Sequence, residues 1–149
     1  MTSFRSILVP YDFSPHADAA LDLAIEVGRL AKSRIVLVHV FRLPIEMLSP
    51  YEIQIPEKLA DDVRAAASTR LERALERVRG AGLKGIAEVD SGSIAETIVA
   101  RAAADAVDLI VMGTRGLSGI QHVVLGSVAE RVLRTAPCPV MTLRALDPA

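Results

Sequence analysis

Short apolar segments alternate with helical segments along the whole chain, and this alternation limits the possible folds more than any other feature. The apolar segments are continuous, as in strands that are buried on both faces of a parallel sheet. They span residues 7–9, 34–41, 86–89, 109–112 and 140–143. A helical pattern follows each of the first four segments. This order predicts one α/β domain over residues 1–149, with a doubly wound, Rossmann-like or flavodoxin-like sheet of five parallel strands in the order 3-2-1-4-5 and helices on both faces.

Cap residues mark where the helices are expected to start. Ser14 precedes a proline, and Ser93 and Ser127 are each followed three residues later by Glu, the spacing of a capping box. A longer helix is predicted between Glu57 and Gly80. Its apolar stripe consists of Leu59, Val63, Ala67, Leu71, Leu75 and Val78.

The composition fits this fold and excludes several classes of function. Apolar residues make up 51% of the chain and aromatic residues only 3%, so the core is expected to be aliphatic. A net charge of −1 gives no basis for non-specific binding to nucleic acid or to an acidic membrane surface. The single Cys138 excludes an intrachain disulfide and a cysteine-based zinc site. No apolar run is long enough to span a membrane, and we expect a cytoplasmic protein.

Two connections remain to be explained. Residues 42–56 contain three prolines, which break regular structure, and suit either a lid or a surface excursion. The second connection is rich in glycine: Gly113, Gly116, Gly119 and Gly126. From residue 109 to 129 there is no Asp or Glu, whereas Arg115 is present. An acid-free glycine loop that leads onto a helix N-terminus suits phosphate, because its backbone N–H groups and the helix dipole favour anions.

The predicted strand order brings a second loop to the same place. Strands one and four would be neighbours, so residues 10–14 would meet the glycine loop at the carboxyl edge of the sheet. Gly113 and Gly116 have no Cβ, so phosphate could approach their backbone N–H groups, although either glycine could equally serve a simple turn. Asp12 could accept hydrogen bonds from ribose or adenine, help to hold Mg²⁺, or only stabilise the turn before the first helix. The hydroxyl of Ser127 can both cap a helix and donate to phosphate.

The spacing of these residues resembles that of a known family. Gly113-x2-Gly116-x9-Gly126-Ser127 matches the G-x2-G-x9-G-[S/T] nucleotide motif of the universal stress protein family, in its ATP-binding branch. Other segments are similar to the same family, and together they cover essentially the whole chain: residues 7–14, 38–40, 111–116 and 137–140.

The resemblance implies a universal stress protein domain that binds ATP, or another adenine nucleotide, with Mg²⁺. Asp12 and Val40 would line the pocket for adenine and ribose, and Pro10 would shape its wall. Met112, directly before the glycine loop, is also expected to contact the nucleotide. The phosphates would be wrapped by the residues that follow the fourth strand: Gly113, Thr114, Arg115, Gly116, Leu117, Ser118 and Gly119. The site would be closed by Gly126, Ser127, Val128 and Ala129. The family also implies a homodimer that is joined through the last strand, residues 140–143.

We therefore expect a regulatory nucleotide-binding module of the stress response, which passes its state to its dimer or to an unidentified protein partner. The alternative is a slow ATP hydrolase, but the loop has no lysine and no acid, and His122 is its one candidate for proton transfer. A phospho-receiver would need paired acids after the first strand, whereas this chain offers Asp90 after the third. A flavodoxin-like carrier would need more aromatic residues around a flavin. A fold kept only for dimer contacts would not need the glycine motif.

Overall fold

The computed structural model describes residues 3–42, 57–115 and 125–144. Five strands form one parallel sheet in the order β3-β2-β1-β4-β5, which confirms the predicted fold class and strand order. In chain order the elements are β1 (Ser6–Pro10), α1 (Pro15–Ala31), β2 (Arg34–Phe41), α2 (Glu57–Gly80), β3 (Gly85–Ser91), α3 (Ile94–Ala104), β4 (Leu109–Gly113), α4 (Ser127–Thr135) and β5 (Val140–Leu143).

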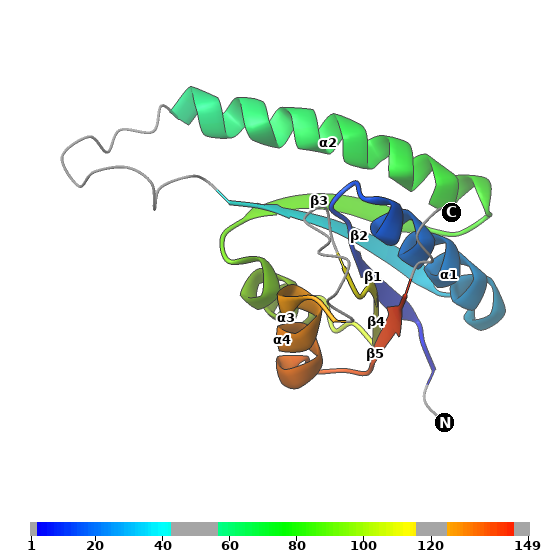
Figure 1. Ribbon diagram of the computed structural model, residues 1–149. Helices are drawn as coiled ribbons and strands as arrows, with labels where there is room; N and C mark the ends of the chain where they lie inside the picture. The colour runs from blue at the N-terminus through cyan, green and yellow to red at the C-terminus, as the bar shows by residue number, and fades with distance from the viewer. Residues whose placement is uncertain (1–2, 43–56, 116–124, 145–149) are drawn as a thin grey trace, which may run out of the picture.

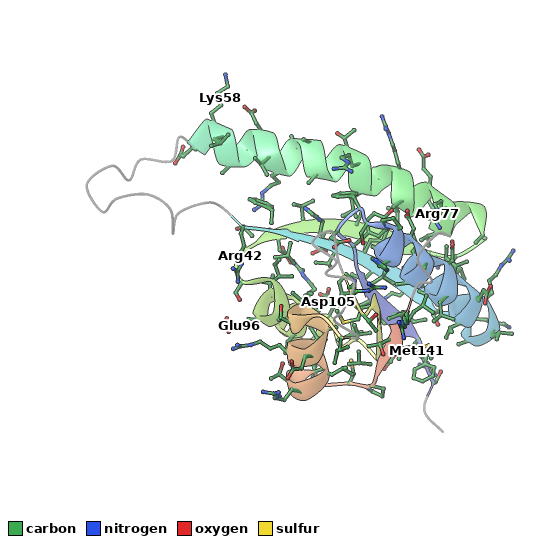
Figure 2. The ribbon with its side chains drawn as sticks, in the orientation of Figure 1. Arg42, Lys58, Arg77, Glu96, Asp105 and Met141 are labelled. Carbon is green, nitrogen blue, oxygen red and sulfur yellow. The ribbon has the colours of Figure 1, made fainter. Side chains whose placement is uncertain are left out.

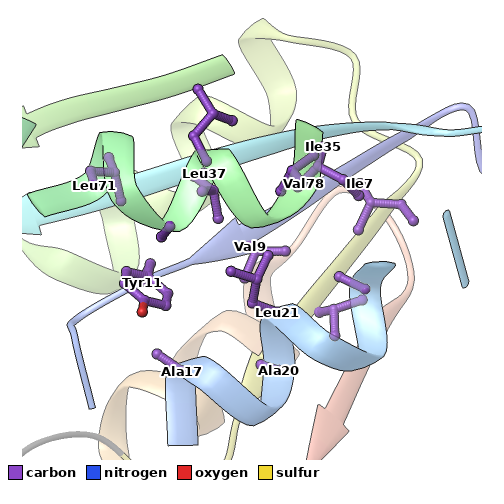
Figure 3. Close-up of a cluster of buried hydrophobic side chains, with 14 of the residues drawn as sticks. Ile7, Val9, Tyr11, Ala17, Ala20, Leu21, Ile35, Leu37, Leu71 and Val78 are labelled. Carbon is purple, nitrogen blue, oxygen red and sulfur yellow. The ribbon is translucent and has the colours of Figure 1, made fainter. Parts of the chain in front are cut away.

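The sheet is covered by helices on both faces (Figure 1). Helices α1 and α2 lie on one face and α3 and α4 on the other. Ile7 and Val9 of β1 pack with α1 and α2, as the close-up of this cluster shows (Figure 3), whereas Leu8 packs with α3 and α4. All three side chains are 0% exposed. Burial on both faces is the physical reason why this strand is continuously apolar in sequence.

The helices start where the sequence predicts, but the predicted capping hydrogen bonds do not all form. Ser14 is the N-cap of α1, and its hydroxyl accepts a hydrogen bond from the N–H of Ala17 (3.1 Å), as predicted. Ser93 is the N-cap of α3, but its side chain makes no capping bond. The Glu96 carboxylate, which a capping box would direct back to the cap, pairs instead with Arg131 of α4 (2.7 Å). The capping box predicted at Ser93 is therefore wrong.

Helix α2 is longer than the surface it covers. The last four positions of its predicted stripe are buried, whereas Leu59 and Val63 remain 47% and 37% exposed. Figure 1 shows the start of α2 extending past the sheet. Within the described ranges, no helix combines the length and the apolar character that crossing a bilayer requires.

This topology creates a crevice at the carboxyl edge of the sheet. The chain leaves β1 toward α1 on one face, whereas the helix that follows the neighbouring strand β4 lies on the other face. Connections that diverge in this way leave space between them, and ligands of open α/β sheets bind there.

Candidate functional site

A pocket of about 410 Å³ occupies the crevice between the ends of β1, β2 and β4 and the starts of α3 and α4. Eighteen residues line it: Pro10, Tyr11, Asp12, Ala17, Val38, His39, Val40, Phe41, Ile94, Ile98, Met112, Gly113, Thr114, Arg115, Gly126, Ser127, Val128 and Ala129.

The pocket brings together every described residue of the predicted site. These residues are Pro10, Asp12, Val40, Met112, Gly113, Thr114, Arg115, Gly126, Ser127, Val128 and Ala129. The remaining predicted contacts (Gly116, Leu117, Ser118 and Gly119) lie outside the described residues, as does His122. The pocket is therefore lined by residues from four places in the sequence: the ends of β1, β2 and β4 and the start of α4.

Sequence reasoning missed part of the lining, above all Ile94 and Ile98 of α3. A signal was available, because Ile94 and Ile98 are apolar and four residues apart, which places them on the same side of a helix. Helix α3 connects β3 to β4 across β2 and β1, so its apolar side must cover the ends of the strands that form the pocket. Val38 could have been found from Val40, since alternate residues of a strand share a face.

One part of the pocket is aliphatic. Val38, Val40, Ile98 and Met112 line it and belong to the core cluster between the sheet, α3 and α4. Their exposed fractions lie between 1% and 9%. A flat apolar group, such as a nucleobase, can be enclosed by such walls through dispersion contacts and exclusion of water.

The opposite part is formed by the start of α4. The N–H of Glu130 donates to the carbonyl of Gly126 (2.9 Å), which is the first bond of the helix. The N–H groups of Ser127, Val128 and Ala129 thus have no acceptor within the helix, as is general for a first turn. Together with the helix dipole, they form an environment that favours an anion.

The capping box predicted at Ser127 is wrong. Gly126 is the N-cap, with an extended backbone, and Ser127 is the first residue inside the helix. The Glu130 carboxylate pairs with Arg134 one turn further on. The cause is the short contact between the Gly126 N–H and the Thr114 carbonyl (2.6 Å), which fixes the start of the helix one residue earlier than a serine cap would. The Ser127 hydroxyl is consequently not used for capping, and the side chain is exposed.

Gly113 and Gly126 both lie where an added Cβ would be crowded by the protein itself. A Cβ on Gly113 would lie 3.0 Å from the Cβ of His16 and 3.1 Å from its carbonyl oxygen, at the start of α1. A Cβ on Gly126 would lie 2.9 Å from the carbonyl oxygen of Thr114. These contacts give a structural reason for both glycines, in addition to the approach of phosphate considered above.

Thr114 connects the pocket to two neighbouring elements. Its N–H donates to the carbonyl of Leu143 at the end of β5 (3.0 Å), and its carbonyl accepts from Gly126 at the start of α4. The side chain is 8% exposed, and its hydroxyl has no hydrogen-bond partner in the described part of the chain. A polar group buried without a partner is unusual and energetically costly.

Asp12 has a structural role in addition to its place in the pocket. Its Oδ1 accepts a hydrogen bond from the N–H of Ser14 (3.0 Å), which stabilises the turn from β1 into α1. Phe13, in the middle of this turn, has a left-handed backbone with φ of 66°. Its ring packs on Tyr11 and His39 at centroid distances of 5.3 and 4.7 Å. The alternative role considered for Asp12, in the turn before the first helix, is thus confirmed.

Tyr11 lines the pocket and connects it to helices α1 and α2, on one face of the sheet. Its hydroxyl donates to the carboxylate of Asp18 in α1, which also pairs with Arg77 of α2 (3.0 Å); Figure 2 labels Arg77 on its helix. Burial, followed by the hydrogen bond to Asp18, raises the pKa of Tyr11 to about 12. The phenol therefore stays protonated at neutral pH.

Several titratable side chains of the described lining already form hydrogen bonds within the protein. His39 donates through Nδ1 to the carbonyl of Tyr11 (2.8 Å), because a carbonyl can only accept. Tyr11 is bound to Asp18, and Asp12 is the single carboxylate among the lining residues. No group of three or more metal-ligating side chains occurs among residues 3–42, 57–115 and 125–144.

Asp90, the candidate phosphate acceptor of a receiver domain, is already engaged. The guanidinium of Arg101 in α3 donates to both of its carboxylate oxygens, at 2.7 to 3.0 Å. The same arginine pairs with Glu88 (2.5 Å). These contacts join β3 to α3 and give Asp90 a structural role.

Comparison with known proteins identifies the family. Residues 3–144 match the model of the universal stress protein family. The chain belongs to the universal stress protein family. A universal stress protein of Thermus aquaticus is 35% identical over 148 residues, which cover 95% of this chain and 99% of that protein.

Solved structures show the same fold. The hypothetical protein MJ0577 superposes with a TM-score of 0.86 at 26% identity, over 98% of this chain and 99% of its own. The universal stress protein UspA from Lactobacillus plantarum gives 0.85 at 25% identity, over 97% and 100% of the two chains.

Two more distant structures contain adenine nucleotides. One is a universal stress protein in complex with cAMP, with a TM-score of 0.71 and 21% identity over 95% of this chain and 98% of that one. The other is a family member from Arabidopsis thaliana with AMP bound, with a TM-score of 0.65 and 20% identity over 94% and 91%. At these identities the likeness establishes a shared fold.

Proposed function

We propose that this universal stress protein is a regulatory module that binds an adenine nucleotide, ATP in the first place. The observation that carries the proposal is the convergence of the motif on one pocket. Gly113 and the Gly126-Ser127 pair, which lie on different elements, line the same pocket as Asp12 and Val40. The bound cAMP and AMP of the two distant family members support the choice of an adenine nucleotide.

The two parts of the pocket suit the two parts of a nucleotide. The aliphatic walls formed by β2, β4 and α3 would enclose the base, and the free N–H groups at the start of α4 would bind phosphate. Arg115, which also lines the pocket, adds a positive charge at the end of β4. A pocket of about 410 Å³ falls in the range of small-molecule sites.

Mg²⁺ would be held mainly by the nucleotide. Mg²⁺ prefers oxygen ligands and keeps several waters, and in nucleotide sites it binds phosphate oxygens with one or two carboxylates. Asp12 is the carboxylate that the described lining offers for this role. The ion would neutralise part of the phosphate charge, which a pocket with one acid and one arginine does not neutralise by itself.

The test is calorimetric titration of nucleotide-stripped protein with Mg-ATP, AMP, cAMP and adenosine, with Ser127→Glu as the decisive variant. An acid in the first turn of a helix favours the helix dipole, so the fold should be as stable as before or more stable. The same charge would repel phosphate by about 1–3 kcal/mol, a loss of about 5- to 150-fold in ATP affinity.

Two controls separate phosphate recognition from general damage. Adenosine has no phosphate, so its affinity should be unchanged by Ser127→Glu. Thr135→Glu places the same charge at the far end of α4, where the side chain is exposed, and should leave ATP binding unchanged. An absence of heat with every adenine nucleotide, for a folded protein, would contradict the proposal.

A further inference from the structure

Five basic residues line a second groove, of about 500 Å³, at the edge of the sheet where the strands begin. They are Arg5, Arg29, Lys32, Arg34 and Lys84. The remaining lining residues are Ser33, Ala81, Gly82 and Leu83, so the lining contains no acid. The nucleotide pocket lies at the opposite edge, where the strands end.

The topology brings these charges together. Arg5 precedes β1, Arg34 begins β2 and Lys84 precedes β3, and these three strands are neighbours in the sheet. The N–H of Arg34 donates to the carbonyl of Arg5 (2.9 Å), and the N–H of Ile35 donates to that of Lys84 (2.9 Å). Three basic residues from distant parts of the sequence are thus adjacent at the backbone.

In the described part of the chain, these five cations also form no ion pair with a carboxylate. Arg77, Arg79, Arg101, Arg131 and Arg134 each pair with a carboxylate. Within the described ranges, none of the five groove residues forms such a pair. Arg34 donates to two neutral oxygens, the Ser6 hydroxyl (3.1 Å) and the Asp105 carbonyl (3.2 Å). The nearby Asp108 carboxylate accepts from the backbone N–H groups of Arg5 and Ser6.

Helix dipoles explain only part of this cluster. Arg29 and Lys32 lie at the end of α1, where cations are favoured by the helix carbonyls. The other three residues come from the starts of strands, which have no comparable dipole. Helix α2 ends beside the same groove, but its last-turn arginines, Arg77 and Arg79, are neutralised by acids. The groove therefore keeps more positive charge than its helix ends require.

We propose that this groove binds a small molecule that carries two or more linked phosphate groups. Arginine forks and lysine ammonium groups are the usual ligands of phosphate oxygens, and several are needed for a multiply charged anion. The groove has the volume of a small-molecule site. The chain has a net charge of −1, so the attraction is local to this edge and is not the broad field that favours nucleic acid.

Inorganic tripolyphosphate is the probe, titrated calorimetrically into the full chain at low salt. The groove variant is Arg29→Gln with Lys84→Gln, and the matched control is Lys58→Gln with Arg73→Gln. The control residues are exposed on α2 outside the groove, and both pairs remove two positive charges. We expect the groove variant to bind at least tenfold more weakly and the control pair to stay within twofold of the unmodified protein. The affinity of the unmodified protein should fall steeply as NaCl is added.

Amide NMR spectra of the same titration locate the bound anion. Shifts are expected at Arg5, Lys32, Ser33 and Lys84, and they should persist in Ser127→Glu, which alters the nucleotide pocket. Three results would overturn the proposal: no binding at low salt, equal affinity in the groove variant with its fold intact, or binding that is lost only in Ser127→Glu. The last result would place the anion in the nucleotide pocket.

Discussion

At the scale of single residues, several residues that line the pocket also stabilise the fold. Asp12 stabilises a turn, and the two motif glycines leave room for neighbouring backbone. The presence of the motif is therefore not evidence of a ligand by itself. The convergence of its parts on one pocket is a stronger argument, because packing alone does not require an aliphatic wall to face a free helix N-terminus.

A substitution at Gly126 should measure how much the close packing at this residue contributes to stability. Gly126→Ala would bring a Cβ within 2.9 Å of the Thr114 carbonyl oxygen, so either the start of α4 or the end of β4 must move. We expect a loss of about 1–3 kcal/mol in the free energy of unfolding, measured by urea denaturation.

Gly80→Ala is the matched control for this loss. No atom lies within 4 Å of the new Cβ, and the residue ends a helix. It should leave stability unchanged or raise it by up to about 1 kcal/mol, through the reduced entropy of the unfolded chain. Equal effects of the two substitutions would show that the close contact at Gly126 does not matter.

At the scale of elements, the alternation of apolar and helical segments predicted each helix and strand in the described part of the chain and the order of the sheet. The start of α4 was predicted at the right residue but with the wrong cap, because the decisive bond joins Gly126 to Thr114 across the loop. No local pattern contains that bond. The apolar stripe of α2 includes Leu59 and Val63, which remain partly exposed, because the sequence cannot show where the sheet beneath the helix ends.

The buried Tyr11 hydroxyl, which is hydrogen-bonded to Asp18 of α1, makes stability depend on pH. Tyr11 has a pKa of about 12 in the folded protein, compared with 10.0 for an unperturbed tyrosine. The folded state therefore holds a proton that the unfolded state loses above pH 10. The stabilisation is complete below pH 10 and is lost as the pH rises to about 12, a decrease of at most about 2–3 kcal/mol.

Tyr11→Phe isolates this effect. The variant should be somewhat less stable at pH 8, because the bond to Asp18 is lost, and its stability should fall less between pH 10 and 12. Denaturant unfolding at several pH values measures both quantities. Parallel pH profiles for the two proteins would show that the Tyr11 proton does not contribute.

At the scale of the whole molecule, the outer edge of β5 has no partner strand in the described part of the chain and is where we expect a second copy to bind. All four residues of β5 are partly exposed, and β5 is an outer strand. The carbonyls of Pro139 and Leu143 accept from Ile110 and Thr114, so these residues face β4. By the alternation of a strand, Val140 and Thr142 present their N–H and carbonyl groups to the open edge. Unpaired edges of this kind invite pairing with another chain.

We therefore expect a homodimer through β5, and Thr142→Pro tests it. Proline removes an N–H that faces outward and leaves the bonds to β4 in place, so the monomer should fold while the edge loses a donor. Sedimentation should show a dimer for the unmodified protein and a shift to monomer for Thr142→Pro. Thr142→Val keeps the N–H and should remain dimeric. A monomeric unmodified protein, or a proline variant that dimerises equally well, would place any assembly elsewhere.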